Sequence, residues 1–167
     1  MALADCDRVA EIRVRGWQSA YRGLIPQSYL DGLSTAEDAE RRRAYFAQAD
    51  DSVVNLVAED DGGALVGWAC HGRYRDGEVL TPDAELYAVY VHPEHLGRGV
   101  GRVLLAESVE RCSGAGHGRL LLWVLKENGR ARRFYERAGF HADGAEEPFE
   151  VEGVTVPEVR YVRALPR

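Results

Sequence analysis

Hydrophobic positions near the start of the chain follow helical spacing. From Asp7 to Tyr21 they recur every three or four residues between charged side chains, which predicts an amphipathic helix. A second long helix is predicted to begin at Ser34, because Glu37 follows three residues later as in a capping box, and to end near Ala49. The segment between these two helices is interrupted by a proline and a glycine.

The middle of the chain is rich in residues that favour strands. Residues 52–73 form two β-rich runs around Asp60–Gly63, a turn sequence that predicts a hairpin. A polar loop is predicted from Tyr74 to Asp83. The following segment, AELYAVYVHP, predicts a strand that is closed by Pro93.

The second half of the chain alternates helices and strands. A glycine-rich stretch leads into a predicted helix through residues 100–112, whose hydrophobic positions form one broad stripe. Three further elements follow: an apolar strand over Arg119–Leu125, a short helix over residues 128–139 and a final strand region over residues 154–165. This order predicts a single α+β domain, residues 1–167, in which helices cover the faces of one mixed sheet.

Composition narrows the functional classes mainly by exclusion. The chain has 167 residues, of which 46% are hydrophobic and 29% charged, as in globular proteins. Its longest apolar run, Leu120–Leu125, is too short for a membrane span, and its first residues lack a signal-peptide layout, so we expect a cytoplasmic protein. Three scattered cysteines, and His92 and His95 without a third ligand, predict neither a disulfide framework nor a metal site.

The charge of the chain excludes another class of partner. The formal net charge is −6 at pH 7. An acidic chain repels nucleic acid, so neither DNA nor RNA is expected as a partner. A small anionic ligand remains compatible with this charge, because a local group of backbone amides can bind phosphate. The arginine-rich composition is typical of a bacterial source.

Three glycines at alternate positions, Gly97, Gly99 and Gly101, stand directly before a predicted helix. Glycine costs roughly 1 kcal/mol relative to alanine in a helix, so a need for bare backbone amides would explain it. Amides at a helix N-terminus bind phosphate, and Arg98 and Arg102 supply further donors. The stretch lacks the lysine of a Walker loop and fits a dinucleotide fingerprint poorly. Two interpretations of the glycine-rich stretch remain: another kind of phosphate site, or a plain surface turn.

The motif LGRGVG, between a strand and a helix, resembles that of the GNAT superfamily of acetyl-CoA-dependent N-acetyltransferases, although Leu96 stands where the family usually has Gln or Arg. A second segment, NGRARRFYERAGF, is similar to the family's other cofactor segment and follows in the expected order. The resemblance is close over Glu85–Phe140. It implies a GNAT-like mixed, mostly antiparallel sheet flanked by helices on both faces.

The resemblance implies acetyl-CoA as co-substrate and no metal. The backbone of Val89–Val91 would pair with the pantetheine arm like an added strand, where two strands of the sheet separate. The glycine stretch would present its amides to the pyrophosphate. The residues implied in cofactor binding are Val89, Tyr90, Val91, Gly97, Arg98, Gly99, Val100, Gly101, Arg102, Asn128, Ala131, Phe134 and Tyr135.

Acetyl transfer to an amine calls for a base. An alkyl ammonium has a reference pKa near 10.4, so its deprotonation at pH 7 costs about 4.6 kcal/mol. By family position Glu85 would be this base, directly or through a water, although the position also suits a solvated carboxylate at a strand end. Tyr135 would protonate the departing thiolate, or else only pack its helix on the sheet. The apolar strand Leu120–Leu125 offers no alternative base.

Aromatic residues of the first two helices fall where the family's acceptor pocket is walled. These are Trp17, Tyr21 and Tyr29, and the spacing of the first two also fits ordinary core packing. The resemblance thus predicts direct transfer of an acetyl group from acetyl-CoA to a primary amine of a small molecule or peptide. A non-catalytic acyl-CoA-binding sensor or partner module is the alternative.

The start of the chain departs from the family, whose small members usually begin with a strand. Only MALADC precedes the first predicted helix. Either the sheet lacks that strand and leaves an edge exposed, or the start of the protein lies upstream. A partner subunit would cover such an edge, and the resemblance favours a homodimer.

Overall fold

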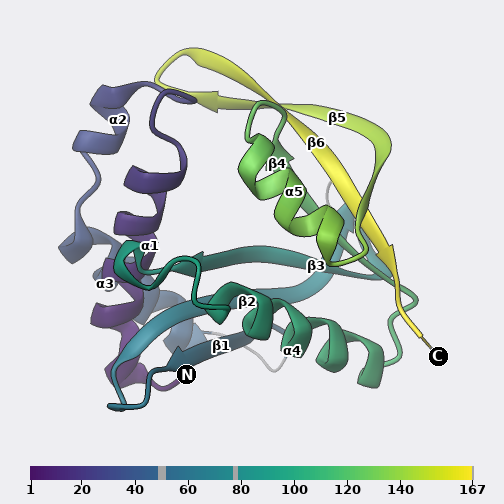
Figure 1. The fold of residues 1–167 in the computed structure, drawn as a ribbon, viewed down its shortest axis with the longest axis horizontal. Coiled ribbons are helices and arrows are strands. Elements are labelled where there is room, and N and C mark those ends of the chain that lie inside the picture. Colours follow the sequence, from purple (N-terminus) through teal and green to yellow (C-terminus); the bar gives the residue numbers. More distant parts are fainter. Residues whose placement is uncertain (49–51, 77–78, 167) are drawn as a thin grey trace.

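The computed structural model describes residues 1–48, 52–76 and 79–166, and packs helices on both sides of one sheet (Figure 1). The helices are α1 (Cys6–Ala20), α2 (Gln27–Asp31), α3 (Thr35–Gln48), α4 (Val100–Gly114) and α5 (Gly129–Arg137). The strands are β1 (Val54–Glu59), β2 (Leu65–Asp76), β3 (Val79–Val91), β4 (Arg119–Leu125), β5 (His141–Val151) and β6 (Val154–Ala164). Short 3-10 turns lie at Leu3–Asp5 and Pro93–His95.

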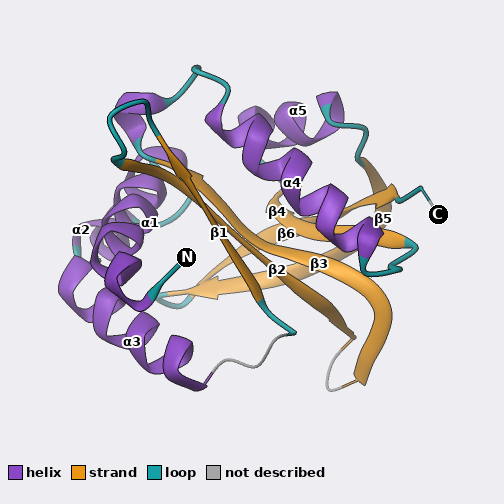
Figure 2. Cartoon of the chain, turned by 90° about the horizontal axis from the view of Figure 1, so that it is seen from below, coloured by secondary structure: helices purple, strands orange, loops and turns teal. Residues whose placement is uncertain are grey.

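The strands are arranged in the order β1-β2-β3-β4-β6-β5. β3 and β4 are parallel, and the other neighbouring pairs are antiparallel. Helix α4 crosses over between the parallel pair, as a parallel connection requires. Helices α1, α2 and α3 cover one face of the sheet, and α4 and α5 cover the other (Figure 2). The predicted fold class is therefore confirmed. No helix in the described part of the chain is long and apolar enough to cross a membrane.

The predicted hairpin around Asp60–Gly63 is confirmed, because β1 and β2 are antiparallel neighbours joined by this turn. One carboxylate oxygen of Asp60 accepts hydrogen bonds from the backbone N–H groups of Ala64 and Gly62, both at 3.0 Å. These bonds, the one from Ala64 most strongly, lower the pKa of the Asp60 carboxyl. The aspartate thus fixes the turn through its side chain.

The polar loop predicted from Tyr74 to Asp83 is wrong, because β2 and β3 continue through it as one long hairpin. Backbone pairing extends to residues 76 and 79, and residues 77 and 78 lie outside the described residues. The Thr81 hydroxyl donates to the Tyr74 carbonyl at 3.2 Å and holds the two strands together. Strand pairing is made by backbone groups, which every residue has. The polar side chains of this segment show no hydrophobic alternation, so the sequence did not predict its strands.

Two elements were not predicted. α2 is a short helix within the segment interrupted by proline and glycine, and it is too short to show a helical period. β5 is exposed along most of its length and contains Gly144 and Pro148, so it lacks the alternation that identifies a strand. β5 is a strand because its backbone pairs with β6, and its side chains give no sign of this pairing in the sequence.

The other helices and strands lie where the sequence predicts them. α3 follows Ser34, whose hydroxyl oxygen accepts a hydrogen bond from the Glu37 backbone N–H at 3.3 Å. This bond is one half of the predicted capping box, and Ala49, the predicted helix end, lies outside the described residues. Residues 3–5 form a 3-10 turn rather than a strand, so β1 is the edge of the described sheet on that side.

Helix α5 is fastened to the sheet by a polar network. The Arg132 guanidinium donates to the Tyr161 hydroxyl on β6 at 3.0 Å and to the Lys126 carbonyl at 2.8 Å. The Tyr161 hydroxyl in turn donates to the Glu136 carboxylate at 2.7 Å. Tyr161 is almost completely buried, so these bonds hold α5 in one orientation.

Helix α4 lies close against the sheet over Gly67 of β2. A Cβ atom on Gly67 would lie 2.8 Å from Val100 Cγ1 and 2.9 Å from Leu104 Cδ1. Both distances are shorter than real Cβ contacts, so a larger residue at this position would force the side chains of Val100 and Leu104 to shift. Gly67 therefore sets the position of the first turn of α4 on the sheet.

We predict that Gly67→Ala lowers the free energy of unfolding by about 1–3 kcal/mol, because the methyl group overpacks the contact between β2 and α4. The matched control is Gly118→Ala, since a Cβ there meets nothing within 4 Å. The control is expected to change stability by less than about 0.5 kcal/mol. Urea unfolding followed by circular dichroism measures both variants, and equal stability would contradict the close approach.

Candidate active site

The parallel strands β3 and β4 pair over only two positions. Ala84 faces Leu120 and Glu85 faces Leu121, and beyond Glu85 no residue of β3 pairs with β4 within the described residues. β4 continues along β6, and β3 continues along β2. The two strands therefore separate in a V, and the edge of β3 from residue 86 to residue 91 borders a gap in the sheet.

A β-bulge lies next to this separation. Cys70 of β2 faces Ala88, whereas the next residue, His71, faces Leu86, so Tyr87 is the extra residue on β3. A bulge bends its strand and changes where the neighbouring side chains point. This bend in β3 accompanies its departure from β4.

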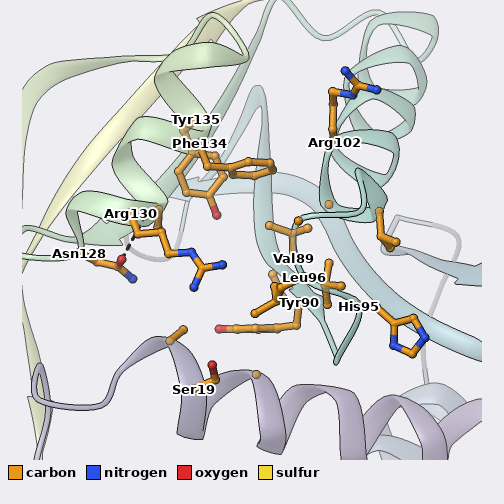
Figure 3. Close-up of a pocket in the computed structure, with 18 of the residues that line it drawn as sticks. Ser19, Val89, Tyr90, His95, Leu96, Arg102, Asn128, Arg130, Phe134 and Tyr135 are labelled. Atoms are coloured by element: carbon orange, nitrogen blue, oxygen red, sulfur yellow. Dashed lines mark hydrogen bonds between the residues drawn. The ribbon is translucent and has the colours of Figure 1, made fainter. Parts of the chain in front are cut away.

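A cavity of about 410 Å³ opens at this separation (Figure 3). Its wall combines the end of α1, the free edge of β3, the glycine-rich turn with the start of α4, and the start of α5. The lining residues are Gly16, Ser19, Ala20, Tyr21, Leu86, Tyr87, Ala88, Val89, Tyr90, Val91, His95, Leu96, Gly97, Gly99, Val100, Gly101, Arg102, Asn128, Arg130, Ala131, Phe134 and Tyr135.

The glycine-rich turn needs its glycines for their backbone conformation as well as for their bare amides. Gly97 has φ of +78° and Gly99 of +87°, in the region that L-residues with side chains rarely adopt. Gly99 is the N-cap of α4, and its carbonyl accepts the hydrogen bond from Val103 N–H at 3.1 Å. The N–H groups of residues 100–102 precede this first helical bond, so they and the positive end of the helix dipole are available to an anion.

Two arginines add positive charge to the same cavity. Arg102 comes from the first turn of α4 and Arg130 from the first turn of α5. Neither forms an ion pair with any residue in the described ranges. The Arg130 side chain extends across the cavity in Figure 3. The cavity therefore carries amides and free guanidinium groups, which suit a ligand with phosphate groups.

The start of α5 contributes a buried asparagine. Asn128 is the N-cap of this helix, and its side-chain oxygen accepts a hydrogen bond from the Ala131 backbone N–H at 3.1 Å. The bond fixes the carboxamide at the cavity wall (Figure 3). Asn128 is only 7% exposed. Because its side-chain oxygen is used in the cap, its amide N–H group is the part that is left for a ligand.

Tyr135 and Phe134 line the cavity from the next turn of α5. Their rings meet edge to face, with centroids 5.2 Å apart. Burial, with a smaller contribution from Tyr90, raises the pKa of the Tyr135 hydroxyl above its usual range. This hydroxyl therefore stays protonated at neutral pH, and it can donate a hydrogen bond into the cavity.

Glu85 stands at the apex of the V, as the last residue of β3 that pairs with β4. It does not belong to the cavity lining, and neither does Arg98. Leu86, the next residue along β3, does line the cavity. Of the residues predicted for cofactor binding, the cavity thus brings together all except Arg98.

The three aromatic residues predicted for acceptor binding are divided by the structure. Tyr21 lines the cavity, and its hydroxyl lies 3.1 Å from that of Tyr90. Trp17 and Tyr29 lie outside the lining, in an aromatic group that borders it. Trp17 is the centre of this group, with ring centroids 4.8 Å from Tyr21, 6.0 Å from Tyr29 and 6.3 Å from Phe149.

Several lining residues escaped prediction from the sequence. Gly16, Ser19 and Ala20, on the last turns of α1, face β3 across the cavity. A Cβ on Gly16 would lie 2.9 Å from a ring carbon of Tyr90, which shows how closely α1 approaches this strand. Arg130 had a usable signal, because it lies between two residues of the predicted motif. In the described parts of the chain, no group of three or more histidine, cysteine or acidic side chains is arranged to hold a metal.

Known proteins share this architecture. Residues 17–140 match the model of the acetyltransferase (GNAT) family. The uncharacterized N-acetyltransferase YuaI of Bacillus subtilis (strain 168) is 32% identical over 157 residues, which are 94% of this chain and 86% of that protein. The L-amino acid N-acyltransferase MnaT of Escherichia coli (strain K12) is 25% identical over 82% of this chain and 74% of its own length. A solved structure of yncA from Salmonella typhimurium with its cofactor acetyl-CoA has a TM-score of 0.74, at 23% identity, and the match covers 100% of this chain and 92% of that one.

The protein is thus an acyltransferase in its fold and in its sequence relatives. The chain belongs to the GNAT family of acetyltransferases. The predicted family and the predicted enzyme class, an acetyl-CoA-dependent acyltransferase, are confirmed.

We predict that Gly99→Val weakens coenzyme A binding at least about tenfold, or about 1.4 kcal/mol, because valine cannot adopt the φ of +87° without strain. Gly101→Ala is the control, since its Cβ would meet Val91 at an ordinary 3.5 Å. It is expected to bind within about twofold of the unchanged protein. Calorimetric titration, with circular dichroism to verify folding, measures both, and equal binding by all three proteins would mean that the glycines form only a turn.

Proposed function

We propose that the protein transfers an acetyl group from acetyl-CoA directly to a primary amine of a small molecule or peptide. The observation that carries this proposal is the shared cavity. One continuous wall joins the amides of the glycine-rich turn, the free edge of β3 and the protonated hydroxyl of Tyr135. A thioester with a pantetheine arm and a pyrophosphate needs these features in this order.

The co-substrate would lie along the separation of β3 and β4. The pyrophosphate accepts hydrogen bonds from the amides between Gly97 and Arg102, with Arg130 as a further cation. The pantetheine amides pair with the backbone of Val89–Val91, which has no strand neighbour on that side. Asn128 and Phe134 form the opposite wall. The chain thus binds its co-substrate mainly through backbone groups.

Glu85 would be the base in this reaction. The amine must lose a proton before or while its nitrogen attacks the thioester carbonyl carbon, and the loss costs about 4.6 kcal/mol at pH 7. Glu85 marks the position where β3 leaves β4, next to the end of the cavity where the acetyl group would lie. The carboxylate takes up this proton, directly or through a water, and leaves a neutral amine that can attack. As the C–N bond forms and the C–S bond breaks, the second proton of the nitrogen passes to the departing thiolate, which leaves as a thiol.

Tyr135 would act on the leaving group. A thiolate has a reference pKa near 8.5, so its protonation is needed less than the deprotonation of the amine. The raised pKa of Tyr135 favours a hydrogen bond to the thiolate over full proton transfer. Removal of this hydroxyl should therefore cost less than removal of the base.

The acceptor would enter between the end of α1 and β3. MnaT is named for acylation of L-amino acids, which supports a small amine as acceptor. The net charge of −6 supports the same choice over an acceptor carried on RNA. A homodimer and a cytoplasmic location are further proposals from the sequence.

We predict that Glu85→Gln lowers kcat/KM by about 10²–10⁴-fold, because the amine loses its base. Tyr135→Phe should lower it by less, because only a hydrogen bond to the thiolate is lost. Both variants should bind coenzyme A as the unchanged protein does. Thiol release is followed across a panel of primary amines.

The reverse order of the two losses would refute these roles. The alternative of a non-catalytic acyl-CoA sensor would be favoured by intact coenzyme A binding without acetylation of any amine in the panel.

A further inference from the structure

Two carboxylates face each other beyond the aromatic group around Trp17. Glu158 on β6 lies directly opposite Glu147 on β5, and on its other side it lies opposite Leu125, the last residue of β4. Directly opposed residues project to the same face of a sheet. Leu125 packs with Trp17 and Tyr21, so Glu158 lies on the face of the sheet that α1 and α2 cover.

Glu158 is partly buried and has no partner of opposite charge. It forms no hydrogen bond or ion pair with any residue in the described ranges. The nearest cation along the chain is Arg160, whose guanidinium pairs with the Asp143 carboxylate at 2.8 Å. Lys126, which follows Leu125, is held by both carboxylate oxygens of Glu146, at 2.8 and 3.0 Å. The charged groups that act on Glu158 are the carboxylates of Glu147 and Glu85.

The surroundings of Glu158 oppose its ionisation. Burial, then the charge of Glu147, then that of Glu85 raise the pKa of the Glu158 carboxyl to about 7. Its own charge contributes to the raised pKa values of the Tyr21 and Tyr90 hydroxyls. These two tyrosines line the cavity, so Glu158 acts electrostatically on the part of the cavity wall that they form.

This arrangement costs stability in the empty protein. A partly buried carboxylate without a partner loses hydration, and a like charge directly across a β-ladder is repulsive. A cation beside Glu158 would offset both costs by charge attraction and a hydrogen bond. The rings of Trp17 and Tyr21 pack with Leu125, the strand neighbour of Glu158, and aromatic faces attract cations. Arg13 lies 4.9 Å from the centroid of the Trp17 ring, but it is paired with Asp38 at 2.7 Å. Glu158 and Glu147 therefore lie near aromatic rings, and neither carboxylate is paired with a cation among the described residues.

We propose that Glu158 is a positioning residue that binds the ammonium group of the incoming acceptor and holds it beside Glu85 for deprotonation. This inference rests on the proposed function and adds to it a second carboxylate from the other end of the chain. The acceptor enters as a cation, and its ammonium forms a charge-assisted hydrogen bond with Glu158. One proton of the ammonium then passes to Glu85, and the neutral nitrogen attacks while another of its N–H groups still donates to Glu158. Glu158 takes part in binding, and Glu85 receives the proton.

The titration of Glu158 gives this role a distinctive signature. An ammonium binds the ionised carboxylate, so affinity should rise with pH between about 6 and 8, while an alkyl ammonium stays protonated throughout. Binding should also lower the pKa of Glu158 and release about half a proton at pH 7. A merely structural carboxylate would not release a proton when an amine binds.

The test uses the whole chain saturated with coenzyme A and two matched probes. 2-Phenylethylamine supplies an ammonium on an apolar body, and 2-phenylethanol has the same body without charge. Calorimetric titration at pH 7 in two buffers of different ionisation enthalpy gives both the affinity and the number of protons released. Glu158→Gln removes the charge, Glu158→Asp retains it, and Glu110→Gln removes an exposed carboxylate from α4 on the opposite face.

The expected result is that Glu158→Gln binds the amine at least tenfold more weakly and releases no proton. Glu158→Asp should release a proton as the unchanged protein does, and Glu110→Gln should match the unchanged protein in both readouts. Coenzyme A binding should be the same in all variants, which also verifies their folding. Equal amine affinity in Glu158→Gln, binding of the alcohol as tight as that of the amine, or no amine binding at millimolar concentration would overturn the proposal.

The outcomes separate this proposal from the proposed function. Amine binding that depends on Glu158, without acetylation of any amine, would leave the ammonium site standing and remove the catalytic role. Acetylation with the same KM for the amine in Glu158→Gln would do the reverse.

Discussion

The separation of β3 from β4 is the constraint on which the rest of the structure depends. Two adjacent parallel strands share only two paired positions, so the sheet gives up backbone hydrogen bonds along the remainder of both edges. That loss has to be compensated by a ligand or by water. It leaves an open backbone edge in the middle of the molecule, and α4, α5 and α1 are placed around it so that the edge lies in a cavity.

The cavity carries opposite electrostatic characters at its two ends. At the starts of α4 and α5, bare amides, the positive end of the α4 dipole and two arginines that form no ion pair with the described residues favour an anion. Near the apex of the V, carboxylates and aromatic rings favour a cation. A net charge of −6 describes neither end, because each end is governed by a few groups within several ångströms. In the proposed reaction, this arrangement would hold an anionic co-substrate and a cationic acceptor without contact between their charges.

Much of the fold and half of the site could be read from the sequence. The glycine-rich motif could be recognised because its backbone conformation requires glycine. The segment from Asn128 onward could be recognised because the cap of α5 requires a residue such as asparagine. β5 and the extension of the β2–β3 hairpin could not be predicted, since ladder bonds between polar residues leave no hydrophobic period. Glu158 was missed for a related reason. Its importance comes from its position opposite Glu147 across a strand pair that the sequence did not reveal.

Tyr90 belongs to both halves of the cavity, because its backbone lies on the open edge of β3 while its hydroxyl meets that of Tyr21 at the end of α1. The remaining acceptor wall comes from α1, α2 and the β5–β6 hairpin, which share no residue with the glycine-rich turn or α5. A substitution in α1, α2 or the β5–β6 hairpin can therefore change the shape of the proposed acceptor wall without altering a residue of the glycine-rich turn or α5. A substitution of Tyr90, in contrast, would affect both parts of the cavity at once.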